Sequence, residues 1–217
     1  TLMLCVLIGA FCVPLAFLVV GERKEKFSME RALHFLDFRK KERVFKVFLV
    51  LFFVMGLSFG LRSGFVFPLF LSANGFDAEM VGLLVGLQIL LAGLFSYLFA
   101  RRFEMRRLIL WSGVLYTIMF ALLGFSGSVL AGVLVVVYGI VEGLLSIGQE
   151  GILSRIAKEE SYGIDIGLLM MGLHSGNTLS LALSGFLISW WGFVAPFLLS
   201  GFIFVVFYMG SYLILKD

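Results

Sequence analysis

The sequence predicts an all-α membrane protein, a polytopic bundle of about seven transmembrane helices. Its 217 residues are 61% hydrophobic and only 14% charged, whereas a water-soluble domain is about 25% charged. The mean hydropathy is +1.08, and apolar residues come in continuous runs of roughly 20, enough to cross a hydrocarbon core about 30 Å thick. Strands of a porin-like barrel would instead alternate over about 10 residues. The spans are therefore predicted to be helices.

Charged and turn residues divide the chain into three regions. Residues 1–20 form one predicted span. Residues 21–43 form a charged connector, in which Ser28 is a candidate N-cap and the spacing of the following apolar residues predicts an amphipathic helix. We interpret this region mainly as a solvated connector between two bundles. The third region, 44–217, holds six predicted spans: 44–72, 79–100, 108–125, 129–153, 165–190 and 193–215.

Basic residues indicate how the bundle is oriented. All but one of the 17 Lys and Arg residues fall in or beside the connector 21–43, the loop 101–107, the segment after the span 129–153 and the C-terminus. The connections expected on the opposite side, SANGFDAE, GFSGS and WWG, contain no basic residue. Because cytoplasmic loops are enriched in Lys and Arg, the connector and the C-terminus are expected to face the cytoplasm. The exception is Arg62.

Arg62 lies within the sequence GLRSG, in a span that carries no other charge from Val47 to Asn74. A charged side chain at the bilayer centre costs about 2.5–3.5 kcal/mol on insertion scales, so it normally faces a cavity or a partner. Gly56, Gly60 and Gly64 repeat every four residues and predict a stripe for close helix packing. Arg62 falls on the opposite face of the predicted helix, so another element must supply its partner.

The predicted span 129–153 offers that partner. Tyr138, Glu142, Ser146 and Gln149 are spaced so that they fall within about 80° of arc on a helix. An ion pair between Arg62 and Glu142 is predicted to neutralise both charges. Three interpretations follow: a substrate or coupling-ion site, a static pair that joins two helices, or an arginine that extends to the outer interface.

Other polar residues in the spans are fewer. His174 and Asn177 are three apart in the sequence GLHSGNT, and Gln88 lies in the span 79–100. Hydrogen bonds between helices are the expected role of all three, with a substrate or proton-relay role as the alternative for His174. With only two histidines, and no glycine-rich phosphate loop that carries a lysine, no metal, cofactor, enzymatic activity or nucleic-acid partner is expected.

Three stretches resemble the major facilitator superfamily. Residues 65–87, FVFPLFLSANGFDAEMVGLLVGL, are similar to the family's turn between the first two helices of a half, and an arginine-rich loop follows the span 79–100. Residues 163–197, GIDIGLLMMGLHSGNTLSLALSGFLISWWGFVAPF, resemble its glycine-punctuated penultimate helix. The resemblance implies the C-terminal six-helix half of such a transporter. Residues 1–20 would then be the last helix of the N-terminal half, and the chain is expected to begin partway through a longer protein.

The family's cytoplasmic motif GxxxDRxGRR is only partly present in SYLFARRFEMRR. Arg101 stands at the acidic position, and Glu104 or Met105 stands at the second glycine. The basic end of the motif is retained. We interpret its arginines mainly as anchors of orientation, with a motif-like role as the alternative: Arg101, Arg102, Arg106 and Arg107.

The resemblance implies a secondary active transporter, a permease or efflux protein of the cell membrane that works by alternating access. The expected partners are membrane lipid, a small organic or drug-like substrate, a proton or other coupling ion, and the N-terminal half. Glu142 is the expected proton carrier, Arg62 would hold an anionic or polar group, and Tyr138 and Gln149 would donate hydrogen bonds. The alternative is a non-transporting receptor or scaffold with the same fold, in which the buried charges are structural.

Overall fold

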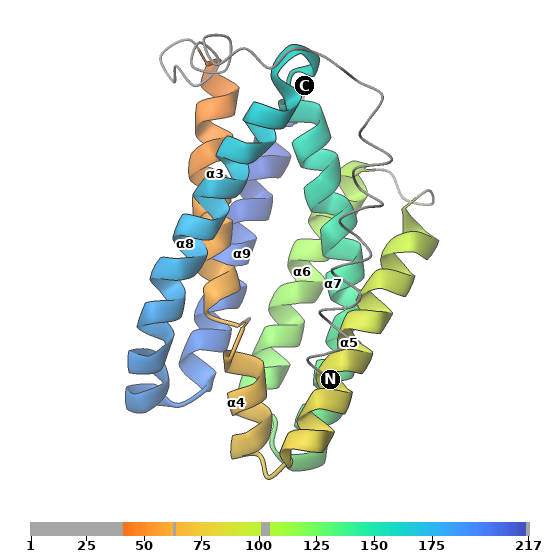
Figure 1. Ribbon diagram of the computed structural model, residues 1–217, viewed down its shortest axis with the longest axis vertical. Coiled ribbons are helices and arrows are strands. Elements are labelled where there is room, and N and C mark those ends of the chain that lie inside the picture. Colours follow the sequence, from red (N-terminus) through yellow and green to blue (C-terminus); the bar gives the residue numbers. More distant parts are fainter. Residues whose placement is uncertain (1–40, 63, 101–104, 216–217) are drawn as a thin grey trace, which may run out of the picture. The chain divides into compact units, whose positions relative to one another are not determined.

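The computed structural model describes residues 41–62, 64–100 and 105–215, with the side chains of Met105 and Arg106 left out. The predicted span 1–20 and nearly all of the connector 21–43 lie outside these residues. Every element in the described part is helical (Figure 1), and six helices are long and apolar enough to cross a membrane. The elements are α3 (Arg43–Gly60), α4 (Val66–Ala73), α5 (Ala78–Phe99), α6 (Met105–Phe125), α7 (Ser128–Ile156), the short 3-10 helix η1 (Glu159–Ser161), α8 (Tyr162–Trp191) and α9 (Val194–Ile214).

The predicted continuous helix 44–72 is wrong, because the chain breaks between α3 and α4. α3 ends at Gly60 and α4 begins at Val66. Gly64 has φ = +66°, a left-handed conformation that is open to glycine but strained for other residues and that cannot continue a right-handed helix. Arg62 therefore lies in a turn, where its backbone N–H donates to the carbonyl of Phe59 at 3.2 Å.

The helices pack mainly in three pairs, α3 with α8, α5 with α7, and α6 with α9. Helices that follow one another in sequence run in opposite directions from α5 onward, so that α3 and α8 begin at the end of the bundle where α5 and α7 finish (Figure 1). The α6–α9 pair joins the other two, since α6 also packs on α7 and α9 also packs on α3. Contact between α3 and α7 is slight by comparison.

Glycines allow the helices of the first two pairs to approach closely. A Cβ atom at Gly56 would lie 2.0 Å from the carbonyl oxygen of Leu173 on α8, and one at Gly139 would lie 2.3 Å from the carbonyl oxygen of Gln88 on α5. Only glycine fits at such crossings. The predicted packing role is confirmed for Gly56 and Gly60. It is wrong for Gly64, which serves the turn instead.

Ionic contacts join the start of α8 to the start of α3. The buried carboxylate of Asp165 pairs with Lys41 and accepts hydrogen bonds from the Ser161 hydroxyl (2.8 Å) and the Lys158 backbone N–H (3.1 Å). Lys158 also pairs with Glu42 at 2.6 Å, and the hydrogen bond and charge of Glu42 raise the pKa of the Lys158 ammonium group. These contacts fix the register of the two helices where they begin.

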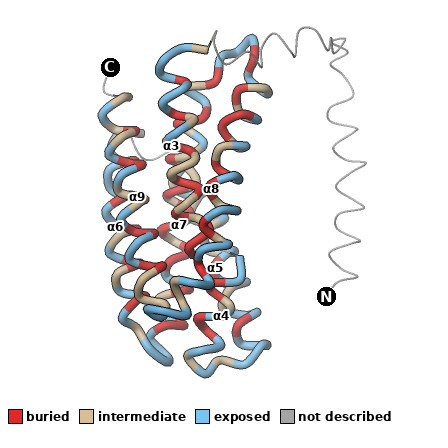
Figure 2. The backbone as a smooth tube through the Cα atoms, turned by 90° about the vertical axis from the view of Figure 1, so that its left-hand side faces the viewer, coloured by how far each residue is buried: buried red, intermediate tan, exposed pale blue. Residues whose placement is uncertain are grey.

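Large apolar side chains are exposed along the outer faces of the helices. They include Leu83 and Leu90 on α5, Trp111 and Phe125 on α6, and Phe186 on α8. Figure 2 shows buried and exposed residues on different sides of the same helices. Because the exposed sides are themselves apolar, they suit contact with lipid or with other helices better than contact with water.

Candidate functional site

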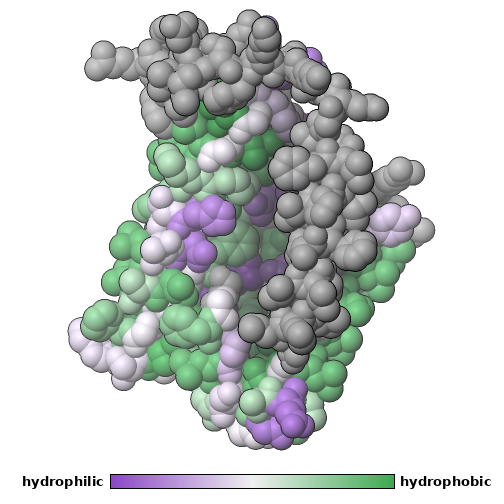
Figure 3. All heavy atoms as spheres, viewed as in Figure 1, coloured by the Kyte–Doolittle hydropathy of each residue, from purple (hydrophilic) through white to green (hydrophobic). Residues whose placement is uncertain are grey.

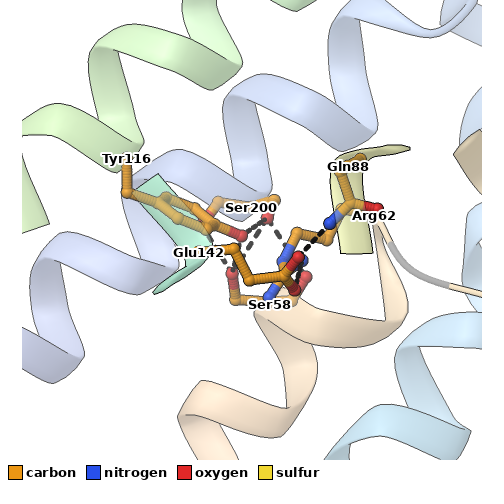
Figure 4. Close-up of polar contacts among 6 residues, drawn as sticks. All are labelled: Ser58, Arg62, Gln88, Tyr116, Glu142 and Ser200. Carbon is orange, nitrogen blue, oxygen red and sulfur yellow. Dashed lines mark hydrogen bonds and ion pairs between the residues drawn. The ribbon is translucent and has the colours of Figure 1, made fainter. Parts of the chain in front are cut away.

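Arg62 and Glu142 form an ion pair inside the bundle, as the sequence predicted (Figure 4). Nη1 of Arg62 lies 3.3 Å from Oε1 of Glu142. The pair joins the turn after α3 to the middle of α7, two elements that otherwise contact each other little. The charge of the arginine is thus paired by a second helix and does not depend on extension toward the membrane interface.

Gln88 is a second donor to the Glu142 carboxylate. Its amide nitrogen donates to Oε2 of Glu142 across the α5–α7 crossing (Figure 4), and the residue is buried. The predicted hydrogen bond between helices is therefore confirmed for Gln88. Its partner, Glu142, was not foreseen from the sequence, because spacing along one helix says nothing about which turn of another helix lies opposite.

Four aromatic rings surround the Arg62 guanidinium group. Its carbon lies 4.3 Å from the ring centroid of Phe59, 5.2 Å from that of Tyr138, 5.3 Å from that of Tyr116 and 5.9 Å from that of Phe120. A cation over aromatic faces is stabilised by their quadrupoles, more strongly where water is excluded. This aromatic cage holds Arg62 as a cation. Among the described residues, Nε and Nη2 of Arg62 have no hydrogen-bond partner.

Three buried hydroxyl groups, one of them on the cage residue Tyr116, link α3, α6 and α9. The Tyr116 hydroxyl is 3.1 Å from Ser58 Oγ and 2.8 Å from Ser200 Oγ, and the two serine hydroxyls are 2.9 Å apart (Figure 4). The network fixes the ring that Tyr116 presents to Arg62. Sequence reasoning missed it, although Ser58 stands one helical turn before Arg62 and that spacing was a usable signal.

Replacing Tyr116 by phenylalanine is expected to lower the free energy of unfolding by about 1 kcal/mol, the typical net value of one buried hydrogen bond. The ring and its cation–π contact remain, and the two serines still bond to each other, so the loss stays small. Thermal unfolding in detergent measures it. The matched control is Tyr97→Phe, at a tyrosine that is 82% exposed, where no change is expected. Equal effects at both sites would contradict the role of the network.

A pocket of about 370 Å³ opens beside the ion pair, between α5 and α7. Its lining includes Glu142 and Ser146, and Ser146 donates a hydrogen bond to Ser96 Oγ on α5 at 3.1 Å. Of the predicted polar stripe, only these two residues reach the pocket. Tyr138 is buried in the aromatic cage, and Gln149 is half-buried outside the pocket lining. The lining consists of Ile89, Ala92, Gly93, Ser96, Glu142 and Ser146.

His174 and Asn177 lie on α8, apart from the ion pair. The His174 side chain is exposed. The Asn177 backbone packs against Gly60, where an added Cβ would lie 2.2 Å from the Asn177 carbonyl oxygen, and its side-chain Oδ1 has no partner among the described residues. Figure 3 shows hydrophilic residues on the surface of α8 and also deeper, in the recess beside it. No hydrogen bond from either side chain joins two helices within the described part of the chain.

The predicted cytoplasmic motif lies largely outside the described residues. Arg101, Arg102 and the side chain of Arg106 are not described, and Arg107 is exposed near the start of α6. Among the residues that the structure describes, no group of three His, Cys, Asp or Glu side chains is placed to hold a metal ion.

Comparison with known proteins gives one match. Residues 47–217 match a family model described as Major Facilitator Superfamily. The match covers all six spans of the described bundle except the first residues of α3. No curated protein and no solved structure matches the chain.

Proposed function

Because the chain belongs to the Major Facilitator Superfamily, whose members are membrane transporters, we propose that it is a secondary active transporter that works by alternating access and is coupled to protons. Its substrate is a small organic solute. The observation that carries the proposal is the Arg62–Glu142 ion pair, which is held within the spans and has its carboxylate open to a pocket.

Glu142 is the proposed proton carrier, and Arg62 is its counter-ion. Protonation removes the charge that holds Arg62 and replaces an ion pair with a weaker neutral contact. The consequence is mechanical, because Arg62 is attached to the α3–α8 pair whereas Glu142 and Gln88 belong to the α5–α7 pair. Proton uptake would therefore loosen the link between two tightly packed helix pairs. Alternating access needs such relative movement around a midplane site.

We also propose how the bundle is oriented in the membrane. The end of the bundle at which α3 begins carries Lys41, Lys158 and their basic neighbours, and it faces the cytoplasm together with the connector 21–43 and the C-terminus. Residues 44–217 form one six-helix bundle in the cell membrane. Residues 1–20 are the last helix of a preceding bundle, the N-terminal half of the whole protein.

The test replaces Glu142 by glutamine in the whole protein, reconstituted in liposomes with an imposed pH gradient. We expect transport to lose its dependence on the gradient, since glutamine keeps the shape of the side chain but cannot take up a proton. The neutral double variant Arg62→Gln/Glu142→Gln serves as a second test in case the single variant folds poorly. Glu150→Gln, on the same helix two turns later, is the matched control and is expected to keep gradient-driven transport. Gradient dependence that survives in a folded Glu142→Gln protein would overturn the coupling role.

A further inference from the structure

Of the two charges in the Arg62–Glu142 pair, the accessible one is negative. The Arg62 side chain is only 2% exposed and lies within the aromatic cage, whereas the Glu142 side chain is 30% exposed and lines the 370 Å³ pocket. A solute in this pocket meets the carboxylate and not the guanidinium group. The sequence alone suggested the reverse, with Arg62 holding an anion.

We propose that the pocket between α5 and α7 binds an organic cation, with Glu142 as its counter-ion. This proposal adds a substrate class to the proposed transport function. It rests on that function, because only a transporter would use the pocket as a substrate site. The substrate class is an amine or guanidine with a compact apolar body.

Glu142 has hydrogen-bonding capacity left for such a ligand. One of its oxygens accepts a hydrogen bond from Arg62, and the other accepts one from Gln88. An ionised carboxylate offers about four acceptor positions in all. An ammonium group carries only donors, so it can use the remaining positions directly. A carboxylate ligand would bring further acceptors to a group that cannot donate to them.

Arg62 does not prevent cation binding at this carboxylate. Its side chain is only 2% exposed and does not belong to the pocket lining, whereas Glu142 does. Coulomb energy falls with distance, so a bound cation is attracted by the nearer carboxylate more strongly than it is repelled by the farther arginine. The four rings of the aromatic cage also stabilise the Arg62 cation. The carboxylate is therefore not its sole source of stabilisation and can interact with a second cation.

The remaining walls suit an apolar body of moderate size. Ile89, Ala92 and Gly93 form the α5 side, and an added Cβ at Gly93 would meet no atom within 4 Å. The pocket thus owes part of its room to the missing side chain. Its volume lies at the lower end of the range of about 300–1,000 Å³ found for small-molecule sites, which favours a one- or two-ring compound.

Binding of three probes of matched shape tests the proposal. They are the naphthylmethylammonium ion, naphthalenemethanol and naphthoate, measured by equilibrium dialysis against the whole protein in lipid nanodiscs, with empty nanodiscs subtracted. We expect the cation to bind at least about tenfold more tightly than the alcohol or the anion, a single order of magnitude in Kd. Glu142→Gln should remove this preference.

A steric variant gives an independent readout that does not alter charge. Gly93→Leu places a side chain in the pocket and should weaken binding of the ammonium probe at least about tenfold. Gly86→Leu is its matched control, because Gly86 lies seven residues earlier on the same helix, also has no atom within 4 Å of an added Cβ, and is not in the pocket lining. This control, like Glu150→Gln, should bind the probe as the wild type does.

The outcomes separate this proposal from the transport function. Naphthoate binding as tightly as the cation, a preference that survives Glu142→Gln, or equal effects of Gly93→Leu and Gly86→Leu would each overturn the cation site. Cation selectivity that depends on Glu142 and Gly93 supports it. If the cation binds in this way but liposomes show no gradient-driven movement of any probe, the site stands and the transport function falls.

Discussion

Replacing Glu142 by leucine is expected to lower the free energy of unfolding by about 3 kcal/mol. The substitution leaves Arg62 buried without a counter-ion, and loss of one partner of a buried pair typically costs about 3–5 kcal/mol. We place the value at the lower end because the aromatic cage continues to stabilise the cation. Denaturant titration in mixed micelles measures the loss.

A second substitution should recover most of that stability. In Arg62→Met/Glu142→Leu neither charge remains, and apolar groups that replace a buried ion pair are often neutral or stabilising. The coupling energy from the complete double-mutant cycle then isolates the pair from other effects of each change. Glu150→Leu is the control on the same helix, at an exposed position, and should change stability by no more than about 0.5 kcal/mol. Additive effects of the two single substitutions would show that the ion pair does not couple α3 to α7.

Replacing Gly176 by alanine is expected to destabilise the protein by about 3 kcal/mol or to prevent folding. A Cβ at this position would lie 2.1 Å from the carbonyl oxygen of Phe53 and 2.9 Å from the backbone nitrogen of Leu57. Both contacts are with backbone atoms of α3, so α3 and α8 would have to separate along their crossing. Overpacking of this kind costs about 1–3 kcal/mol and occasionally more.

Gly185→Ala on the same helix is the matched control for this steric argument. Gly185 is exposed and has no atom within 4 Å of an added Cβ. Alanine there should be neutral or should stabilise the protein by up to about 1 kcal/mol, because glycine is the weaker helix former. Thermal unfolding and the yield of monodisperse protein measure both variants. If the two substitutions have the same effect, the close approach of α3 and α8 is not what holds the bundle together.

The sequence by itself determined the class of fold and the helices. Hydropathy depends on local composition, and a span must be apolar over its whole length whatever it packs against. The six spans of the region 44–217 were therefore found to within a few residues, apart from the break after Gly60. α7 and α8 each extend about one turn beyond the predicted spans, at the ends that η1 connects. The pairing of Arg62 with Glu142 was also predictable, because two opposite charges within membrane spans have few other partners.

Only the tertiary structure decided how that pair is used. The break that places Arg62 in a turn depends on Gly64 taking a left-handed conformation, which glycine permits but does not require. The aromatic cage is assembled from α3, α6 and α7, and the second donor to Glu142 comes from α5. Which of two paired charges faces a pocket is a property of the surfaces that several helices form together. A periodic pattern on one helix does not specify how the neighbouring helices are rotated or shifted along their axes. Only the three-dimensional structure therefore shows that the carboxylate is exposed and the arginine enclosed.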